Sequence, residues 1–289
     1  MDNKRYPAGG FPPQTQSRQP GSEAKMDPLP TQPDTSLKPK RNLLGKTALI
    51  TGGDSGIGRA VAIAYANEGA NVAIVYLDEH ADATKTKQLV EESGGSCLTI
   101  DADLTDSTAC NQAIQDTIAH FGELNILVNN CAVQYPKNSL LDISDEQLEL
   151  TFRTNFYSHV YMTRASLPHL KPGDTIIFTS SINAHIGNET LIDYTSTKGA
   201  ITAFARSMAK SLVSQEIRVN IVAPGPIWTP LIPSSFDQDK VAQFGANTPM
   251  GRAGQPSELS SAYVFLASEG ASYMTGQTIH INGGDYMSS

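Results

Sequence analysis

The chain has 289 residues, of which 39% are hydrophobic and 17% charged, with a formal net charge of -8 and a sequence pI of about 5.2. This length allows one large α/β domain with a sizeable core, or two small domains. The acidic balance leaves no basic field for nucleic-acid phosphates or anionic lipid, so it argues against nucleic acid and membrane as partners and favours a small metabolite.

The N-terminal 40 residues differ in composition from the rest of the chain. They are rich in Pro, Gln, Ser and Lys and have no helical or strand periodicity. Such a segment buries too little apolar surface to order by itself. Residues 1–40 are therefore predicted to be a flexible Pro/Gln-rich arm, either a solubilising extension or an arm that lies on a neighbouring subunit. We find no signal-peptide core and no apolar run near the roughly 18 residues of a spanning helix, and we expect a cytoplasmic protein.

From Lys46 onwards, short apolar runs alternate with stretches of helical periodicity. The runs predict buried strands at 47–51, 72–76, 97–100, 125–129, 175–179, 218–222 and 278–281. Helices are predicted between them at about 57–68, 80–93, 107–121, 145–170 and 194–213. Apolar strands that alternate with helices are typical of a parallel sheet covered on both faces. Residues 41–289 are thus predicted to form a single α/β domain, a doubly wound parallel sheet in three α/β/α layers.

Three cysteines, Cys97, Cys110 and Cys131, are odd in number and lack CxxC spacing. This pattern favours reduced thiols that pack in the core over a disulfide framework or metal ligands. We therefore expect no bound metal.

A glycine-rich turn, residues 51–58, joins the first predicted strand to the first helix and reads Thr-Gly-Gly-Asp-Ser-Gly-Ile-Gly. A pyrophosphate can bind there, because the backbone N–H groups are free and the helix dipole is positive at that end. Glycine is required where a Cβ would block the phosphate or the packing of the helix on the strand. A plain strand-to-helix loop could use the same residues. The predicted nucleotide contacts of the turn are Gly52, Asp54, Ser55, Gly56, Ile57 and Gly58.

A hydrolase is an alternative reading of the same turn, with Ser55 as nucleophile. The nucleophile elbow needs Gly-x-Ser-x-Gly, and here Ile57 stands in the last position. The turn also lies too early in the chain to have an upstream oxyanion loop. The hydrolase therefore remains a minor alternative.

The second strand ends in Tyr76-Leu77-Asp78-Glu79, about twenty residues beyond the turn. An acidic side chain there would bind the hydroxyls of an adenosine ribose, whereas a basic one would accept the 2′-phosphate of NADP. No Arg or Lys stands in this stretch. We therefore predict that Tyr76, Leu77 and Asp78 contact a dinucleotide and that Asp78 favours NAD, with NADP still possible. A solvated loop carboxylate is the alternative for Asp78.

Tyr194 and Lys198 are four residues apart in a predicted helix, so the phenol and the ammonium share one face. A phenol has a pKa near 10, and an adjacent ammonium favours phenolate and lowers that pKa toward the working range. We expect this pair to exchange a proton with a substrate oxygen. A surface Tyr/Lys pair at helical spacing is the common alternative.

The glycine turn and the Tyr-x-x-x-Lys pair together resemble the short-chain dehydrogenase/reductase family, from about Leu44 to the C-terminus. The resemblance implies a Rossmann-type fold, a homotetramer and NAD(P)-dependent hydride transfer to or from an alcohol or carbonyl, with Tyr194 as general acid/base. Ser181 matches the family's serine, which orients the substrate oxygen. Asn155 matches the asparagine that holds a water behind Lys198, and Lys198 would also bind the nicotinamide ribose.

Further motifs match the family with one departure. Asp103, followed by Leu104, resembles the aspartate beside the adenine, and Asn129-Asn130 resembles the first half of an Asn-Asn-Ala-Gly stretch. The match breaks at Ala132, where a Cβ replaces the glycine beside the cofactor. The Pro-Gly segment after the sixth strand adds the cofactor contacts Pro224, Gly225, Ile227 and Thr229.

Residues from Trp228 to about Met250 resemble a variable lid over the substrate pocket, with Pro230, Leu231, Pro233 and Phe236. The predicted substrate contacts are Ser181, His185 and Trp228, with Ile186 and Asn188 beside them. These apolar and neutral polar groups, without an arginine clamp, favour an uncharged alcohol, aldehyde, ketone or sugar.

The alternative to an enzyme is a catalytically idle dinucleotide-binding protein with a regulatory or structural role. Ala132 permits this alternative. The intact Ser181, Tyr194 and Lys198 argue against it.

Overall fold

A seven-stranded parallel sheet forms the centre of the computed structural model, which describes residues 11–32 and 42–288. The strand order is β3-β2-β1-β4-β5-β6-β7. Parallel pairing runs through the whole order. The strands are β1 (Thr47–Thr51), β2 (Asn71–Tyr76), β3 (Cys97–Asp101), β4 (Ile126–Asn129), β5 (Thr175–Thr179), β6 (Arg218–Pro224) and β7 (Thr278–Ile281). Because the order reverses at β1, the crevice outside the carboxyl ends of β1 and β4 is the expected place for a ligand.

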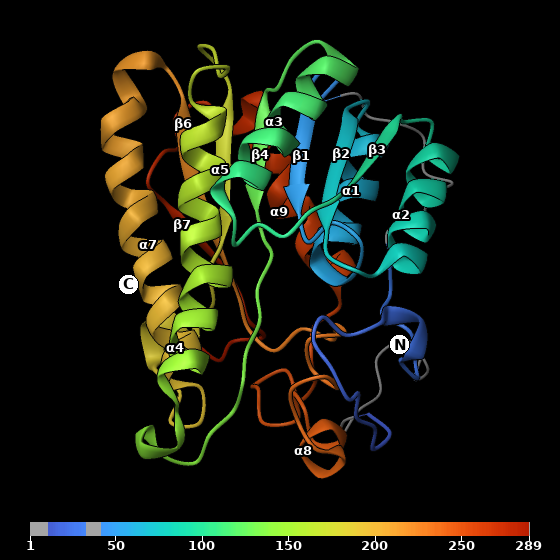
Figure 1. Cartoon of the computed structure of the whole chain (residues 1–289), viewed down its shortest axis with the longest axis vertical. Coiled ribbons are helices and arrows are strands. Elements are labelled where there is room, and N and C mark those ends of the chain that lie inside the picture. The colour runs from blue at the N-terminus through green and yellow to red at the C-terminus, as the bar shows by residue number, and fades with distance from the viewer. Residues whose placement is uncertain (1–10, 33–41, 289) are drawn as a thin grey trace.

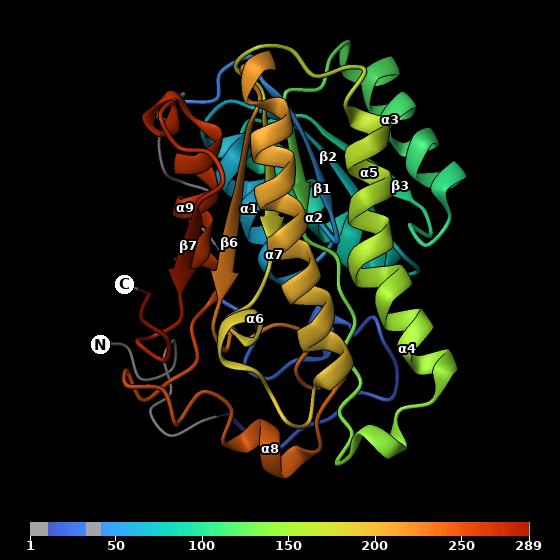
Figure 2. The ribbon, with the colours of Figure 1, turned by 90° about the vertical axis from the view of Figure 1, so that its left-hand side faces the viewer.

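Helices cover both faces of the sheet (Figure 1, Figure 2). On one face, Ile50 of the sheet packs in a cluster with α1 (Gly56–Asn67), α2 (His80–Glu92) and α9 (Pro256–Ala267). On the other, Leu127 packs in a second cluster with residues of three further helices, α3 (Ser107–Phe121), α5 (Ser158–Ser166) and α7 (Ile192–Leu212). The predicted three-layer, doubly wound domain is therefore confirmed. Shorter helices lie outside these layers, α4 (Asp145–Phe152), α6 (Asn183–Ile186) and α8 (Gln238–Ala242).

Two helical regions differ from the sequence-based expectation. The single helix predicted over 145–170 is interrupted, because a π-helical turn at Arg153–Tyr157 separates α4 from α5. Helix α9 was not predicted. It begins with Pro256 behind a capping box formed by Gln255 and Glu258, and this start signal is readable in the sequence.

Residues 11–32 pack on the domain at the carboxyl edge of the sheet, near α8 (Figure 1). The Phe11 ring stacks on Trp228 with 3.9 Å between ring centroids. Phe11 and Met26 are buried in a cluster with Ile232 and Val241. The prediction of a flexible arm is therefore corrected for this segment, because the apolar surface that orders it is supplied by the rest of the chain. For residues 1–10 and 33–40 that prediction lies outside the described residues.

Two features are absent from the described ranges, 11–32 and 42–288, namely a membrane-spanning helix and a cluster of metal-binding side chains. Neither range contains a helix long and apolar enough to cross a membrane. The same ranges hold no group of three or more His, Cys, Asp or Glu side chains placed to bind a metal ion. The three cysteines are free thiols, and burial raises the pKa of Cys97 and of Cys110 to about 12.

Candidate active site

Two adjoining cavities open at the carboxyl edge of the sheet. The turn-side cavity, about 390 Å³, lies against the glycine turn and the ends of β2 and β3. The tyrosine-side cavity, about 300 Å³, is lined by Ser181, Tyr194 and Lys198. The two cavities share the lining residues Ile57, Asn130, Ala132, Thr229 and Leu231. A long ligand can therefore reach from the turn to Tyr194.

The glycine turn has the backbone shape expected of a phosphate site. Gly52 and Gly56 have φ values of +62° and +51°, a region that L side chains rarely adopt. A Cβ on Gly58 would lie 1.9 Å from the carbonyl oxygen of Gly52, so only glycine lets α1 pack on the turn. The turn residues Gly52, Asp54, Ser55, Gly56 and Ile57 line the turn-side cavity, whereas Gly58 acts through packing. Their contact with a nucleotide stays a prediction.

The far end of the turn-side cavity is lined by Tyr76, Leu77, Asp103 and Leu104, all predicted. Asp78 follows this lining but is exposed and adopts a positive φ of 63°.

Next to Asp78 in the chain, the buried Glu79 forms an ion pair with Arg18, with 2.5 Å between Arg18 Nη2 and Glu79 Oε1. This ion pair was not predicted from the sequence. Arg18 is 61 positions from Glu79 in the chain, so no local pattern near β2 could reveal it.

Asn130 fixes the junction of the two cavities. Its Nδ2 donates to the carbonyl oxygens of Thr51 and Gly52 at 3.1 and 3.2 Å, and its Oδ1 accepts from Thr179 Oγ1 at 3.1 Å. Ala132 lines both cavities. The described non-glycine residues with positive φ are Asp78 and Glu216, so Ala132 does not need a glycine conformation. Its Cβ is accommodated without backbone strain.

Tyr194 and Lys198 lie on α7 and face the tyrosine-side cavity. Lys198 is buried, and its Nζ donates to the Thr179 carbonyl at 2.9 Å and lies 5.5 Å from the centroid of the Tyr194 ring. Ser181 hydrogen-bonds the Tyr194 side chain. The neighbouring Ser180 side chain turns inward and donates to the Lys198 carbonyl at 3.0 Å. The structure thus brings together the predicted serine, tyrosine and lysine.

Burial is the main cause of the pKa shifts of Tyr194 and Lys198. It raises the pKa of Tyr194 to about 12, and the hydrogen bond with Ser181 offsets only part of that increase. Burial also lowers the pKa of Lys198 to about 8. The expected lowering of the Tyr194 pKa by Lys198 is therefore corrected, because the low-polarity surroundings penalise both the phenolate and the ammonium.

Asn155 lies on the π-helical turn, a feature often found at functional sites. Its Oδ1 accepts from Val133 N at 2.8 Å, and its Nδ2 donates to Val133 O at 2.9 Å and to Thr197 Oγ1 at 3.2 Å. The fully buried amide thus ties the loop that follows β4 to α7, at Thr197, one residue before Lys198. Its part in a water relay stays a prediction.

The Pro-Gly segment at the end of β6 borders the tyrosine-side cavity, and its contact with a cofactor stays a prediction. Pro224, Gly225, Ile227 and Thr229 all line the tyrosine-side cavity. A Cβ on Gly225 would approach the Asn282 Cα to 2.6 Å, which explains the glycine there.

Two predicted substrate contacts lie elsewhere. Trp228 is fully buried and its Nε1 donates to the Pro28 carbonyl at 2.8 Å, so it anchors residues 11–32. His185 stacks on Tyr286 with 5.0 Å between ring centroids and is absent from the cavity lining. Both predictions are corrected, since each ring finds an aromatic partner away from the cavity. Ile186, Asn188, Leu231 and Phe236 do line the tyrosine-side cavity, together with Gln134, Leu191, Ile232 and Phe244, which the sequence did not single out.

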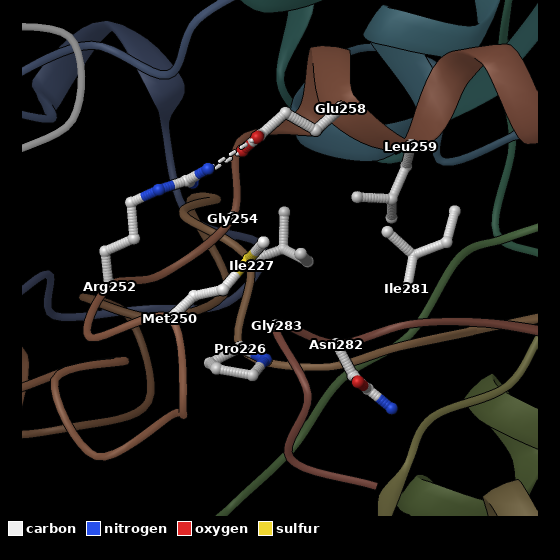
Figure 3. A pocket seen from close by; sticks show the side chains of 10 residues that line it. All are labelled: Pro226, Ile227, Met250, Arg252, Gly254, Glu258, Leu259, Ile281, Asn282 and Gly283. Carbon is white, nitrogen blue, oxygen red and sulfur yellow. Dashed lines mark hydrogen bonds and ion pairs between the residues drawn. The ribbon is translucent and has the colours of Figure 1, made fainter. Parts of the chain in front are cut away.

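A small third pocket of about 60 Å³ lies behind Ile227, which also lines the tyrosine-side cavity (Figure 3). Arg252 and Glu258 form an ion pair at its rim, with 2.8 Å between Nη2 and Oε1. The pocket has room for only a few water molecules. We therefore assign the ligand site to the two larger cavities.

His159 is a buried polar residue behind the site. Its Nε2 lies 3.1 Å from the Cys131 carbonyl oxygen. Burial, and to a lesser extent the charge of Lys198, lowers the pKa of His159 to about 3. The imidazole is therefore neutral in the folded protein at ordinary pH, whereas in the unfolded chain its pKa is about 6.5.

Because of His159, the free energy of unfolding is expected to decrease as the pH is lowered. Between pH 6.5 and 5 the unfolded chain binds the additional proton, which lowers stability by about 1.6 kcal/mol. Burial raises the pKa of Asp54 to about 6, so protonation of Asp54 increases the stability of the fold over the same pH range. Asp54 is present in both wild type and His159→Gln, so the difference between the two proteins isolates the contribution of His159. Urea titrations of both proteins at the two pH values should show it. Equal pH dependence would contradict a neutral buried imidazole.

Comparison with known proteins agrees with this geometry. A family model described as enoyl-(acyl carrier protein) reductase matches residues 52–285. The uncharacterized oxidoreductase YhdF of Bacillus subtilis is 59% identical over 280 residues, 97% of each chain. The glucose and ribitol dehydrogenase of Daucus carota is 50% identical over 96% of this chain and 97% of its own. A short chain dehydrogenase from Burkholderia cenocepacia, solved in complex with NADP, superposes with a TM-score of 0.80 and 28% identity, covering 84% of this chain and 99% of that one.

The fold, the glycine turn and the Ser-Tyr-Lys cluster therefore define a short-chain dehydrogenase/reductase, and the chain belongs to that family. It is an oxidoreductase by this membership, and a nicotinamide nucleotide is the supported cofactor.

Proposed function

We propose that the protein transfers a hydride between a nicotinamide nucleotide and an alcohol or carbonyl substrate, with Tyr194 as general acid/base. The observation that carries the proposal is that Ser181, Tyr194 and Lys198 face one cavity that adjoins the glycine turn. The nucleotide would supply or accept the hydride when bound. The chain itself orients the substrate oxygen through Ser181 and moves the proton at the Tyr194 hydroxyl.

Burial keeps the Tyr194 hydroxyl protonated, which is the form that a general acid needs when a carbonyl is reduced. With a pKa of about 12, the phenol holds its proton at neutral pH and can donate it to a carbonyl oxygen. Lys198 would hold the nicotinamide ribose and stabilise the phenolate formed. Asn155 would keep Lys198 in place and connect it to solvent through water.

The nucleotide is proposed to be held by residues of both cavities. The pyrophosphate would lie at the turn, against Gly52, Ser55 and Ile57, and the adenine against Asp103 and Leu104. The nicotinamide end would lie against the segment after β6.

For the choice of cofactor we propose NAD over NADP. The reason is the pair of carboxylates at the end of β2, Asp78 and Asp101, where Asp101 Oδ1 accepts from the Asp78 backbone nitrogen at 3.5 Å. The Arg18 guanidinium beside them is engaged by Glu79. NADP is the alternative, supported by the nucleotide in the Burkholderia cenocepacia structure. The ratio of kcat/KM for NAD and NADP decides it, and a ratio below one would overturn the preference.

The substrate is proposed to be an uncharged alcohol, aldehyde, ketone or sugar. Apolar side chains such as Leu191, Ile232 and Phe236 line the tyrosine-side cavity together with Asn183, Asn188 and Gln134. This mixture suits a neutral ligand with hydroxyl groups. The name of the Daucus carota relative, a glucose and ribitol dehydrogenase, points the same way.

The test is a panel of alcohols, aldehydes, ketones and sugars with NAD(H) and NADP(H) in both directions, followed at the nicotinamide absorbance band. Turnover of at least one neutral substrate is expected, and efficient turnover of a carboxylate substrate would contradict the substrate class. A protein that binds the nucleotide but turns over none of the panel would favour the idle dinucleotide-binding alternative.

A homotetramer is part of the proposal. Apolar side chains remain exposed on helices, with Leu148 and Leu150 of α4 at 42% and 44% exposure and Phe265 of α9 at 40%. Light scattering should give four times the mass of the chain, and a monomer would contradict this proposal.

A further inference from the structure

The N-terminal segment contributes directly to the cavity that receives the nucleotide. Gln19, Pro20 and Gly21 line the turn-side cavity together with the glycine turn. Gly21 is wedged against the lid, because a Cβ there would lie 2.5 Å from the Pro230 carbonyl oxygen. The cavity is therefore bounded by a segment that is remote in sequence from the dinucleotide motifs.

Buried polar contacts fasten this segment beside the glycine turn. The Glu23 carboxylate forms an ion pair with the Arg59 guanidinium, and both side chains are buried. Glu23 Oε2 also accepts from Gly56 N at 2.6 Å, and the Glu23 backbone nitrogen donates to Asp82 Oδ2 at 2.7 Å. A second attachment, Phe11 and Pro28 on Trp228, lies on the lid.

Between Phe11 and Glu23, the segment crosses from one side of the cleft to the other at Arg18 and Gln19. Arg18 pairs with Glu79 behind the end of β2. The next residue, Gln19, bonds the backbone of Gln134 on the far side, with Nε2 donating to Gln134 O at 2.5 Å and Oε1 accepting from Gln134 N at 3.1 Å. Gln134 is 4% exposed and lines the tyrosine-side cavity. Two successive residues thus connect the two ends of the ligand cleft.

We propose that residues 11–32 act as a strap that closes over the bound nucleotide and slows its release, with Gln19 as the positioning residue. This inference rests on the proposed function for the identity of the ligand. A nucleotide under the strap leaves readily only when the two Gln19–Gln134 hydrogen bonds break. Loss of the strap should therefore act on the dissociation rate more than on the association rate.

Deletion of residues 1–32 would strip Arg59 of its carboxylate partner and could unfold the chain, so the test uses Gln19→Ala in the full-length protein. The dissociation constants of NADH and NADPH are measured by nucleotide fluorescence, and the release rate by stopped flow. We expect both quantities to rise about tenfold for the preferred nucleotide, as expected for the loss of about 1.4 kcal/mol of binding free energy. The melting temperature should stay unchanged.

The matched control is Lys25→Ala, which alters an exposed side chain of the same segment and should leave nucleotide binding unchanged. If Gln19→Ala binds the nucleotide as wild type does, the strap is refuted while the proposed function stands. Tighter binding by Gln19→Ala would also refute it, because the segment would then compete with the nucleotide. If the wild-type protein binds neither nucleotide, the proposed function itself fails and the strap has no ligand.

Discussion

Tyr194→Phe is expected to lower kcat by about 10²- to 10⁴-fold while the dissociation constant of the nucleotide changes by less than about twofold. The phenol is buried in the tyrosine-side cavity and hydrogen-bonded to Ser181. Its removal takes away the proton donor and leaves the turn-side cavity intact. Steady-state kinetics with a substrate found in the panel, together with fluorescence titration of the nucleotide, measure the two effects.

Tyr273→Phe is the control for this variant, because Tyr273 is a fully exposed tyrosine and its phenol should not affect turnover. A Tyr194→Phe protein with near wild-type kcat would refute the assignment of the general acid/base. Loss of nucleotide binding together with activity would instead indicate that the substitution disturbs the fold of the site.

Arg59→Met is expected to lower the free energy of unfolding by about 3 to 5 kcal/mol, the cost of leaving buried charges without their partner. The Arg59 side chain is 6% exposed and pairs with Glu23 and with Asp82, both equally buried. Its Nε also donates to Asp54 O at 3.0 Å and to Thr86 Oγ1 at 2.8 Å. Methionine keeps much of the volume but leaves two carboxylates buried together. Equilibrium urea unfolding measures the difference.

Lys87→Met is the control, because Lys87 forms an exposed ion pair with Glu91 on α2, at 3.9 Å. Surface pairs of this kind contribute about 0 to 1 kcal/mol. If Arg59→Met costs no more than the control, the buried cluster does not hold the N-terminal segment on the domain. The double variant Arg59→Met/Glu23→Gln should recover part of the loss, since it removes one of the two unpaired carboxylates.

The sheet, most of its helices and the proposed Ser-Tyr-Lys cluster could be predicted from local sequence patterns and family resemblance. Buried parallel strands are largely apolar runs, so β1 and β5 could be located to the residue. The partly buried β7 was also located to the residue, from the short run Thr278–Ile281. Gly52 and the Tyr194/Lys198 pair are local patterns, in which spacing along one element fixes the geometry. Ser181 was placed through family resemblance, and the structure sets its side chain, and not that of Ser180, toward Tyr194.

Features that depend on contacts between distant parts of the chain could not be predicted from local patterns. Trp228 and His185 looked like pocket residues because they stand in the variable segments, yet Phe11 and Tyr286 cover their rings. The acidity of Tyr194 follows from burial, which four-residue spacing to Lys198 does not reveal.

The clearest case is the part of the N-terminal segment that the structure describes, residues 11–32, whose composition predicts disorder because it has too few apolar residues to form a core alone. It is ordered through Arg59, Trp228 and the backbone of Gln134, partners from 36 to 200 positions away in sequence. No pattern within the segment encodes those contacts, and with them the fold completes the wall of its own ligand cleft.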